Sequence, residues 1–258
     1  MRHDDPVSVD PSWQLAAALV ALVALAVLVS WRAGFGQQRG IIVAAVRAAL
    51  QLALVSGIIV AAIAQVWSSL LFVALMFTIG VYTTCKRTDV RGSWPWAALA
   101  MAAGIVPVLA IIFGLRVAPF EGVSIIPIAG IITGNMMSAH TLTGRRLFPA
   151  LRDNIGTYEA GLSIGLMRRD AISLVTSRQV AEALVPTIDN TRTVGLVTLP
   201  GAFIGVLLGG GSPLQAGAAQ LLVLVGIMTG QVLTVATAHE LILRAKLLPA
   251  DLKQRLRP

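Results

Sequence analysis

Cysteine and histidine are scarce in this sequence, which removes several kinds of site. The 258 residues include one cysteine, Cys85, and three histidines. A single cysteine excludes an intramolecular disulfide and a cysteine cluster for zinc. His3, His140 and His239 lie too far apart to give the pair that zinc needs on one helix face, so we predict no metal site.

Charge is scarce as well. Charged residues make up 12% of the chain, whereas an ordinary soluble domain has about 25%. Two long runs, 48–85 and 193–239, contain no charge at all. A bilayer core takes about 20 apolar residues per helix, so each run is long enough for two membrane spans. The bilayer is therefore the solvent for most of this protein.

Catalytic motifs are also missing. No glycine is followed by lysine, so the glycine-rich loop that cradles the phosphates of ATP is absent. Neither a Gly-x-Ser-x-Gly elbow nor a His-Glu-x-x-His pair is present. We predict that the chain is not an enzyme and has no cofactor of its own, and that any ATP is hydrolysed by a separate subunit.

The apolar segments predict an all-α polytopic transmembrane bundle of about seven spans, in a single domain over 1–258. A backbone inside lipid must satisfy its own hydrogen bonds, and these segments lack the alternation of a barrel. Trp13 and Trp31 bound the first span, as an interfacial aromatic belt predicts. The spans are expected at about 13–31, 41–64, 69–86, 94–114, 124–143, 194–210 and 216–242.

Basic residues divide unevenly between the two sides of this bundle. One set of loops holds 17 of them, and the other holds only Arg2 and Arg116. The positive-inside rule therefore places the N-terminus outside and the C-terminus in the cytoplasm. We expect the protein in a plasma or inner membrane. The net charge of +8 lies in short patches between apolar segments, which argues against a nucleic-acid partner.

One predicted cytoplasmic segment, 144–193, is much longer than the other loops. Within it, 171–185 is typical of an amphipathic helix whose apolar face includes Leu174, and Pro186 is expected to end or kink that helix. Two interpretations stay open for the segment, namely a solvated linker and a docking surface for a cytoplasmic partner.

Polar and helix-breaking residues inside the spans are candidates for a transport pathway. Asn135 needs a partner in hydrocarbon, either a neighbouring helix or a wet cavity. Met136 is either a soft ligand for a metal in transit or a packing residue. Gly130 and Gly134 have the spacing of close helix contacts. Proline removes backbone hydrogen bonds, and kinks are expected at two positions, Pro127 and Pro200.

Two stretches carry a family resemblance. Residues 126–137, IPIAGIITGNMM, and 184–201, LVPTIDNTRTVGLVTLPG, resemble the two signatures of the FetB-type ABC permease family, which includes plant relatives linked to aluminium tolerance. The second match includes Pro186, Asp189, Arg192 and Gly195. The resemblance implies a permease that exports iron or another metal and works as a homodimer with a separate cytoplasmic ATPase.

A shorter match lies inside the cytoplasmic segment. Glu159, Ala160 and Gly165 resemble the start of the coupling motif of ABC importers, and Arg168 and Arg169 follow after two further residues. The rest of that motif is absent, because 175–178 lacks its Ile-x-Leu-Pro. The resemblance therefore implies a coupling helix in general and not the importer fold.

We predict an ABC transporter permease subunit whose pathway runs near Asn135, Pro127, Gly134, Met136 and Pro200. The alternative is an ion-coupled secondary transporter or channel without an ATPase. Such a protein needs carboxylates inside its spans for coupling. Glu240, near the end of the last predicted span, is the one acid available there.

Overall fold

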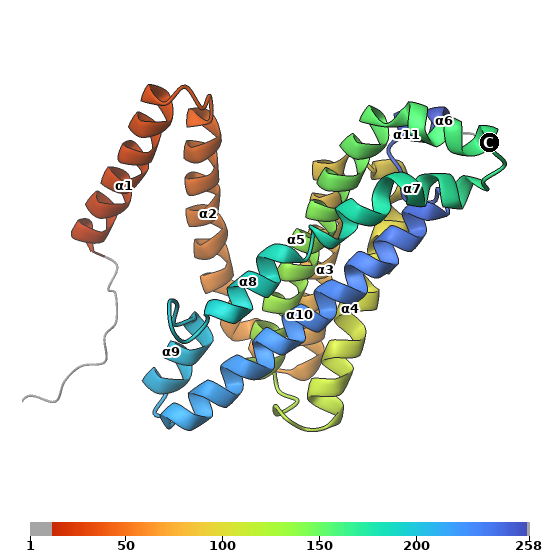
Figure 1. The fold of residues 1–258 in the computed structure, drawn as a ribbon. Coiled ribbons are helices and arrows are strands. Elements are labelled where there is room, and N and C mark those ends of the chain that lie inside the picture. Colours follow the sequence, from red (N-terminus) through yellow and green to blue (C-terminus); the bar gives the residue numbers. More distant parts are fainter. Residues whose placement is uncertain (1–11, 257–258) are drawn as a thin grey trace, which may run out of the picture. The chain divides into compact units, whose positions relative to one another are not determined.

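The computed structural model describes residues 12–256, and its regular elements in that range are helices (Figure 1). The predicted all-α class is therefore confirmed. The helices are α1 Trp13–Arg32, α2 Gln38–Ile63, α3 Val66–Thr88, the 3-10 turn η1 Arg91–Ser93, α4 Trp94–Gly114, α5 Gly122–Asp153, α6 Ile155–Ser163, α7 Arg168–Ala181, α8 Val185–Thr193, α9 Gly201–Leu208, α10 Pro213–Leu243 and α11 Ala250–Arg255.

Six helices of the described range are long and apolar enough to cross a bilayer, which confirms a multi-pass membrane protein: α1, α2, α3, α4 with η1, α5 and α10. The predicted span 194–210 has a different structure, because only α9, with 8 residues, is helical there. A helix of that length covers about 12 Å, much less than the 30 Å or so of the hydrocarbon core.

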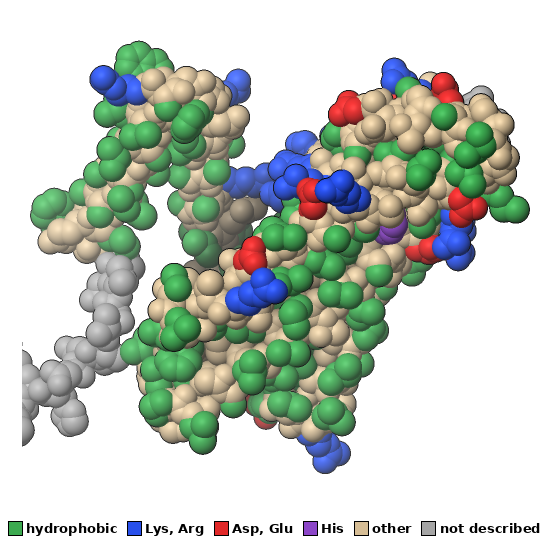
Figure 2. Space-filling model, in the orientation of Figure 1, with side chains coloured by type: hydrophobic (Ala, Val, Ile, Leu, Met, Phe, Trp, Pro, Cys, Tyr) green, Lys and Arg blue, Asp and Glu red, His purple; other side chains and the backbone are tan. Residues whose placement is uncertain are grey.

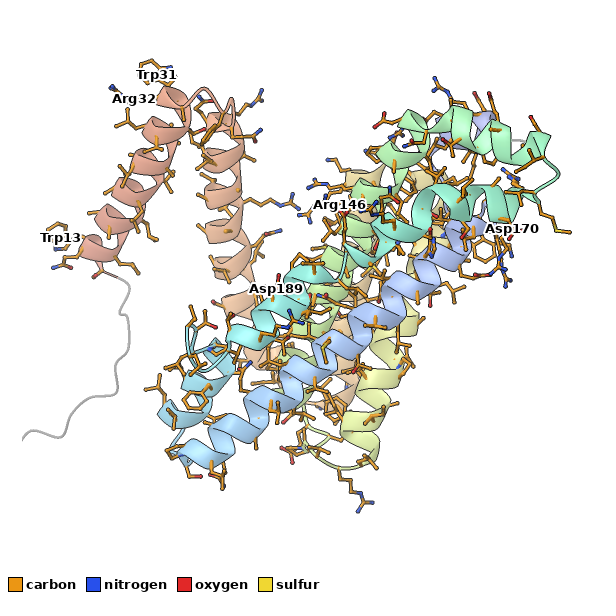
Figure 3. All side chains as sticks on the ribbon, in the orientation of Figure 1. Trp13, Trp31, Arg32, Arg146, Asp170 and Asp189 are labelled. Carbon is orange, nitrogen blue, oxygen red and sulfur yellow. The ribbon has the colours of Figure 1, made fainter. Side chains whose placement is uncertain are left out.

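Two compact units make up the chain, Met1–Ala62 and Ile63–Pro258, and the prediction of a single domain over 1–258 stays a prediction. In the first unit, the Ser12 hydroxyl caps α1 by accepting a hydrogen bond from the backbone N–H of Leu15. Trp13 and Trp31 lie at opposite ends of α1 (Figure 3). Most of the large apolar side chains of α1 and α2 are exposed, as expected of helices in contact with lipid.

Four helices, α3, α4, α5 and α10, pack together at the centre of the second unit. The helices α4 and α10 cross closely at Gly104 and Gly230. A Cβ atom on Gly104 would lie 2.4 Å from the Gly230 carbonyl oxygen and 2.1 Å from Oγ1 of Thr234. Only glycine permits this approach, as is usual between membrane helices.

One end of the second unit is built from α6, the start of α7, α11 and the last turns of α5 and α10 (Figure 1). Arg152 donates two hydrogen bonds, of 2.7 and 3.0 Å, to the Asp251 carboxylate and so holds α11 against α5. These bonds lower the pKa of Asp251.

The predicted cytoplasmic segment 144–193 is largely helical, because it contains the end of α5 and all of α6, α7 and α8. Because α5 continues to Asp153, about ten residues beyond the predicted span, it is longer than the hydrocarbon core.

The predicted amphipathic helix exists, with shifted limits and a shifted face. It is α7, and its buried residues are Ala171, Ile172, Val175 and Thr176. Leu174, expected on the buried face, is 56% exposed. Pro186 lies in the first turn of α8, so it begins a helix. Proline suits that position because its missing N–H would have no partner in any first turn.

Candidate functional site

Three polar side chains connect α5, α8 and α10 inside the second unit. Gln231 on α10 is buried, and its Nε2 atom donates to the backbone oxygen of Asn135 at 3.4 Å and to Asn135 Oδ1 at 3.5 Å. The Thr187 hydroxyl on α8 donates to Gln231 Oε1. We call Asn135, Gln231 and Thr187 the polar cluster.

The polar cluster lies well inside two of the long helices. Asn135 is about 20 Å along α5 from Gly122, and Gln231 is about 18 Å from the last residue of α10 at 1.5 Å per residue. Uncharged polar groups at such positions need partners, because hydrocarbon provides none. Asn135 Nδ2 also donates to the backbone oxygen of Ile131 at 2.8 Å.

Helix α8 is polar along most of its length. Asp189 and Arg192 form an ion pair at 3.5 Å one turn apart, and both side chains are more than half exposed. Figure 2 shows an acidic and a basic group together on the surface at α8 with apolar side chains around them, and Figure 3 labels Asp189 there. Three of the four family-signature residues, Pro186, Asp189 and Arg192, thus belong to the helix that carries Thr187.

The fourth signature residue, Gly195, lies where the chain leaves the helix. Residues 194–200 are non-helical, Val194 pairs with Thr198, and Gly195 has φ +87°, a conformation that favours glycine. Pro200 does not kink a helix as predicted, because it immediately precedes α9. Residues 185–208 therefore form two short helices, α8 and α9, with a non-helical break between them, and both helices pack on α10. Interrupted helices line the substrate sites of many transporters.

A second amide side chain of α10, that of Gln220, lies near this break. Gln220 precedes Gln231 by 11 residues, about three helical turns, so the two share one face of the helix. Gln220 is 6% exposed and its Oε1 atom is buried without a hydrogen-bond partner. Gln220 lines a small cavity together with Gly195 and Leu199 of the broken segment.

The other predicted pathway residues have different surroundings. Met136 is fully buried, and its Sδ atom lies where α4 and α10 cross, 2.9 Å from a Cβ atom placed on Gly104. This is the environment of a packing residue. Pro127 is on the exposed surface of α5. Gly134 is exposed too, and a Cβ atom placed there would have no neighbour within 4 Å, so the close helix contact expected at Gly134 is absent.

A helical hairpin, formed by α6, the turn 164–167 and α7, contains the predicted coupling residues. We call it the α6–α7 hairpin. Two apolar side chains, Ile164 and Met167, are 79% and 77% exposed in its turn, and Gly165 between them has φ +91°. Glu159 and Ala160 are exposed on α6, whereas Arg168 is partly buried at the start of α7. Exposed apolar side chains rimmed by polar residues are typical of a protein-binding site.

Polar contacts fix this hairpin to the end of α10. Arg169 donates to Glu240 at 2.8 Å, and this hydrogen bond raises the pKa of the guanidinium. Glu240 also accepts from Arg244 at 2.7 Å. Further along α7, the Thr176 hydroxyl lies 2.9 Å from Nε2 of His239. The structure thus brings one predicted coupling residue, Arg169, into direct contact with a membrane-spanning helix.

No group of three or more His, Cys, Asp or Glu residues in the described part of the chain is arranged to hold a metal ion. The polar cluster offers neutral amide and hydroxyl groups instead. Such groups form hydrogen bonds to a solute or to the water around a cation. They bind a cation more weakly than a ring of carboxylates does.

Comparison with known proteins places this architecture in a family. The sequence model of a family described as "Uncharacterised protein family (UPF0014)" matches residues 12–247. The chain belongs to the UPF0014 family. No solved structure matches it.

Several curated UPF0014 proteins are similar to the chain. The rice UPF0014 membrane protein STAR2 is 34% identical over 210 residues, which cover 80% of this chain and 74% of STAR2. The Arabidopsis thaliana protein ALUMINUM SENSITIVE 3 is 32% identical over 212 residues, or 81% and 77% of the two chains. The Escherichia coli protein named "Probable iron export permease protein FetB" is 28% identical over 212 residues, or 81% and 82%. The predicted family resemblance is confirmed.

Sequence reasoning on this UPF0014 protein identified Asn135 and missed its partners Gln231 and Thr187. Gln231 lies in an uncharged apolar run, where a single amide barely changes the hydropathy. One signal was available, because Gln220 and Gln231 are the two amides in the interior of α10 and have helical spacing. Thr187 carried no such signal, since a threonine among polar residues is typical of a loop.

Proposed function

We propose that this UPF0014 protein is the membrane permease subunit of an ABC transporter that exports a metal ion, with a separate ATPase as its partner. The observation that carries the proposal is the connection made by α10. At one end Glu240 binds Arg169 of the α6–α7 hairpin, and in the interior Gln231 joins the polar cluster. A single helix thus links a surface suited to an ATPase with a polar group inside the membrane.

The ATPase docks on the turn of the α6–α7 hairpin. Ile164 and Met167 provide apolar contacts, and Glu159 with Arg168 provides polar ones at the rim. Binding and release of ATP then move the hairpin, and the Arg169–Glu240 contact transmits the movement to α10. The 17-to-2 division of basic residues supports a cytoplasmic position for the hairpin. The N-terminus is then outside and the C-terminus inside, an arrangement in which the broken segment 185–208 crosses the membrane in addition to the six long helices.

The substrate passes along the face of α10 that carries Gln231 and Gln220, beside the broken segment 185–208. Non-helical backbone is tolerated at membrane depth only where protein or a wet cavity covers it, so the break supports a pathway there. Iron is the proposed substrate because the FetB relative is named an iron export permease. Oxygen-bearing side chains suit a hydrated cation in transit.

Two copies of the permease form the complete transporter, since one chain, with six long apolar helices between residues 12 and 256, supplies half of the membrane portion of an ABC transporter. The ion-coupled alternative is less well supported. Its best carboxylate, Glu240, is already bound by Arg169 and Arg244, so it is not free to carry a proton or an ion.

Co-expression with a candidate ATPase tests the proposal. The pair is purified, reconstituted in liposomes and assayed for ATP hydrolysis with and without Fe²⁺. Co-purification and metal-stimulated hydrolysis are expected. A permease that recruits no ATPase and transports iron in response to an ion gradient alone would contradict the proposal and favour the ion-coupled alternative.

A further inference from the structure

An apolar groove with a basic end lies between α3 and α4, away from the polar cluster. Its volume is about 270 Å³. On α3 it is lined by residues spaced along one face, including Phe77, Val81 and Cys85. Arg91, the first residue of η1, and two residues of α4, Trp94 and Ala98, also line it. We call this cavity the α3–α4 groove.

The groove is apolar and long enough to hold part of an acyl chain. From Phe77 to Cys85 it follows α3 over about 12 Å at 1.5 Å per residue. The groove is open to the surroundings of the bundle, as shown by Tyr82 and Trp94, which line it and are 62% and 60% exposed. In a membrane, hydrocarbon surrounds this surface, so a lipid chain is the ligand available to fill the groove.

The basic end selects among lipids. Arg91 is exposed and forms no ion pair with any residue that the structure describes. Lys86 and Arg87, in the last turn of α3, are exposed as well, and Asp89 is the one acid in this stretch. Three cations near one acid attract an anionic headgroup, and each basic residue near an anionic lipid surface contributes about 1 kcal/mol.

Aromatic residues fix the depth of this end. Trp94 is the first residue of α4, where the chain leaves the turn after α3. Tryptophan and tyrosine concentrate at the boundary between headgroups and hydrocarbon, with their polar atoms toward water. Arg91 therefore lies at headgroup level, while Phe77 lies deeper. The order of charge, aromatic ring and apolar groove matches that of phosphate, glycerol and acyl chain in a phospholipid.

We propose that the α3–α4 groove binds an anionic phospholipid, with its phosphate at Arg91 and one acyl chain along α3 toward Phe77. The bound lipid fills the space between two of the four central helices and stabilises their contact. This site is independent of the proposed transport function, because it shares no residue with the polar cluster or the α6–α7 hairpin.

The test compares lipids on the purified full-length protein in detergent. Melting temperature and native mass spectrometry are recorded with phosphatidylglycerol, with phosphatidylcholine of the same chains, and with glycerol phosphate. Wild type should bind phosphatidylglycerol at least about fivefold more tightly than phosphatidylcholine, the ratio that corresponds to about 1 kcal/mol. Equal binding of the two lipids would overturn the proposal, and so would equal stabilisation by glycerol phosphate, because the acyl chain would then be unnecessary.

Variants separate the two ends of the site. Arg91→Gln should reduce the preference for phosphatidylglycerol several-fold, whereas Arg91→Lys should retain it. Ala98→Phe, which fills the groove without changing the charge, should weaken binding of both lipids. Arg116→Gln removes an exposed basic residue outside the groove and should behave as wild type. Melting without added lipid checks the folding of each variant. An unchanged lipid preference in Arg91→Gln would overturn the assignment of the headgroup.

Discussion

The guanidinium of Arg169 lies 2.8 Å from the carboxylate of Glu240, and this contact joins the α6–α7 hairpin to α10. Glu240 also binds Arg244 one turn later on the same helix. Glu240 thus holds the hairpin at a fixed position on the helix that carries Gln231. In the proposed transporter, this is where a movement of the docked ATPase reaches the membrane helices.

Removal of this carboxylate should uncouple hydrolysis from transport. In Glu240→Gln, the ATPase should still bind, while the amount of metal moved per ATP hydrolysed should fall several-fold. The melting temperature should change little, because the Arg169 and Glu240 side chains are 58% and 35% exposed and water screens the pair. Paired assays of hydrolysis and transport measure the ratio.

The matched control is Glu182→Gln, which breaks the exposed ion pair of Glu182 with Arg146 at 3.2 Å. That pair does not involve α10, so its loss should leave the ratio unchanged. A wild-type ratio in Glu240→Gln would show that coupling follows another route.

Charge in the turn of the α6–α7 hairpin should release the ATPase. Ile164→Asp and Met167→Asp each replace an exposed apolar side chain, and the folded permease should stay in the membrane because neither residue is buried. Glu159→Lys and Gly165→Glu should act in the same direction. Pull-down of the ATPase by tagged permease measures the loss.

Leu174→Asp is the control for this surface. Leu174 is also exposed and apolar, but it lies on α7 beyond the turn. Its substitution should leave co-purification intact. Wild-type yields of ATPase with Ile164→Asp and Met167→Asp would exclude the turn as the docking site.

Topology follows from the distribution of basic residues and has a direct test. On a Cys85→Ser background, a cysteine in place of Glu121 should react with an impermeant maleimide added to intact cells. A cysteine in place of Arg169 should react only after permeabilisation. Both positions are exposed at the surface of the structure, so the reagent can reach them from the correct side. The reverse pattern of labelling would place the α6–α7 hairpin outside.

The crossing of α4 and α10 should be sensitive to one methyl group. Gly104→Ala places a Cβ atom 2.1 Å from Thr234 Oγ1. It should lower the free energy of unfolding by about 1–3 kcal/mol, since backbone as well as side chains must shift. Gly134→Ala enters open space and should be neutral or slightly stabilising. Thermal unfolding in detergent compares the two. Equal melting temperatures would contradict this helix packing.

The sequence predicted the long spans well because a charge inside hydrocarbon is so costly that uncharged runs mark them. It failed at 194–210, where composition is apolar but Gly195 adopts φ +87° and Pro200 precedes α9. Hydropathy measures how a segment partitions into lipid and is insensitive to whether its backbone is helical. The break therefore became visible only from backbone geometry.

Part of the candidate site was predictable for a similar reason. Asn135 stood out as an amide inside a span, and the structure gives it the partner that such a group needs. Met136 was ambiguous in sequence, since a thioether suits both packing and metal binding, and its complete burial at a helix crossing favours packing. Contacts such as Arg169 with Glu240 join residues 71 apart in sequence and depend on the tertiary fold.

Transport by variants of the polar cluster tests the central claim most directly. The permease and its ATPase are reconstituted in liposomes, and ATP-dependent iron movement is measured for wild type, Asn135→Leu and Gln231→Leu. Each substitution removes an amide at similar volume. If the cluster lines the pathway, both variants should lose at least about tenfold in transport, equivalent to about 1.4 kcal/mol, while basal hydrolysis and melting temperature stay near wild type. Wild-type transport in both variants, with only a lower melting temperature, would contradict the account and reduce the polar cluster to a contact between helices.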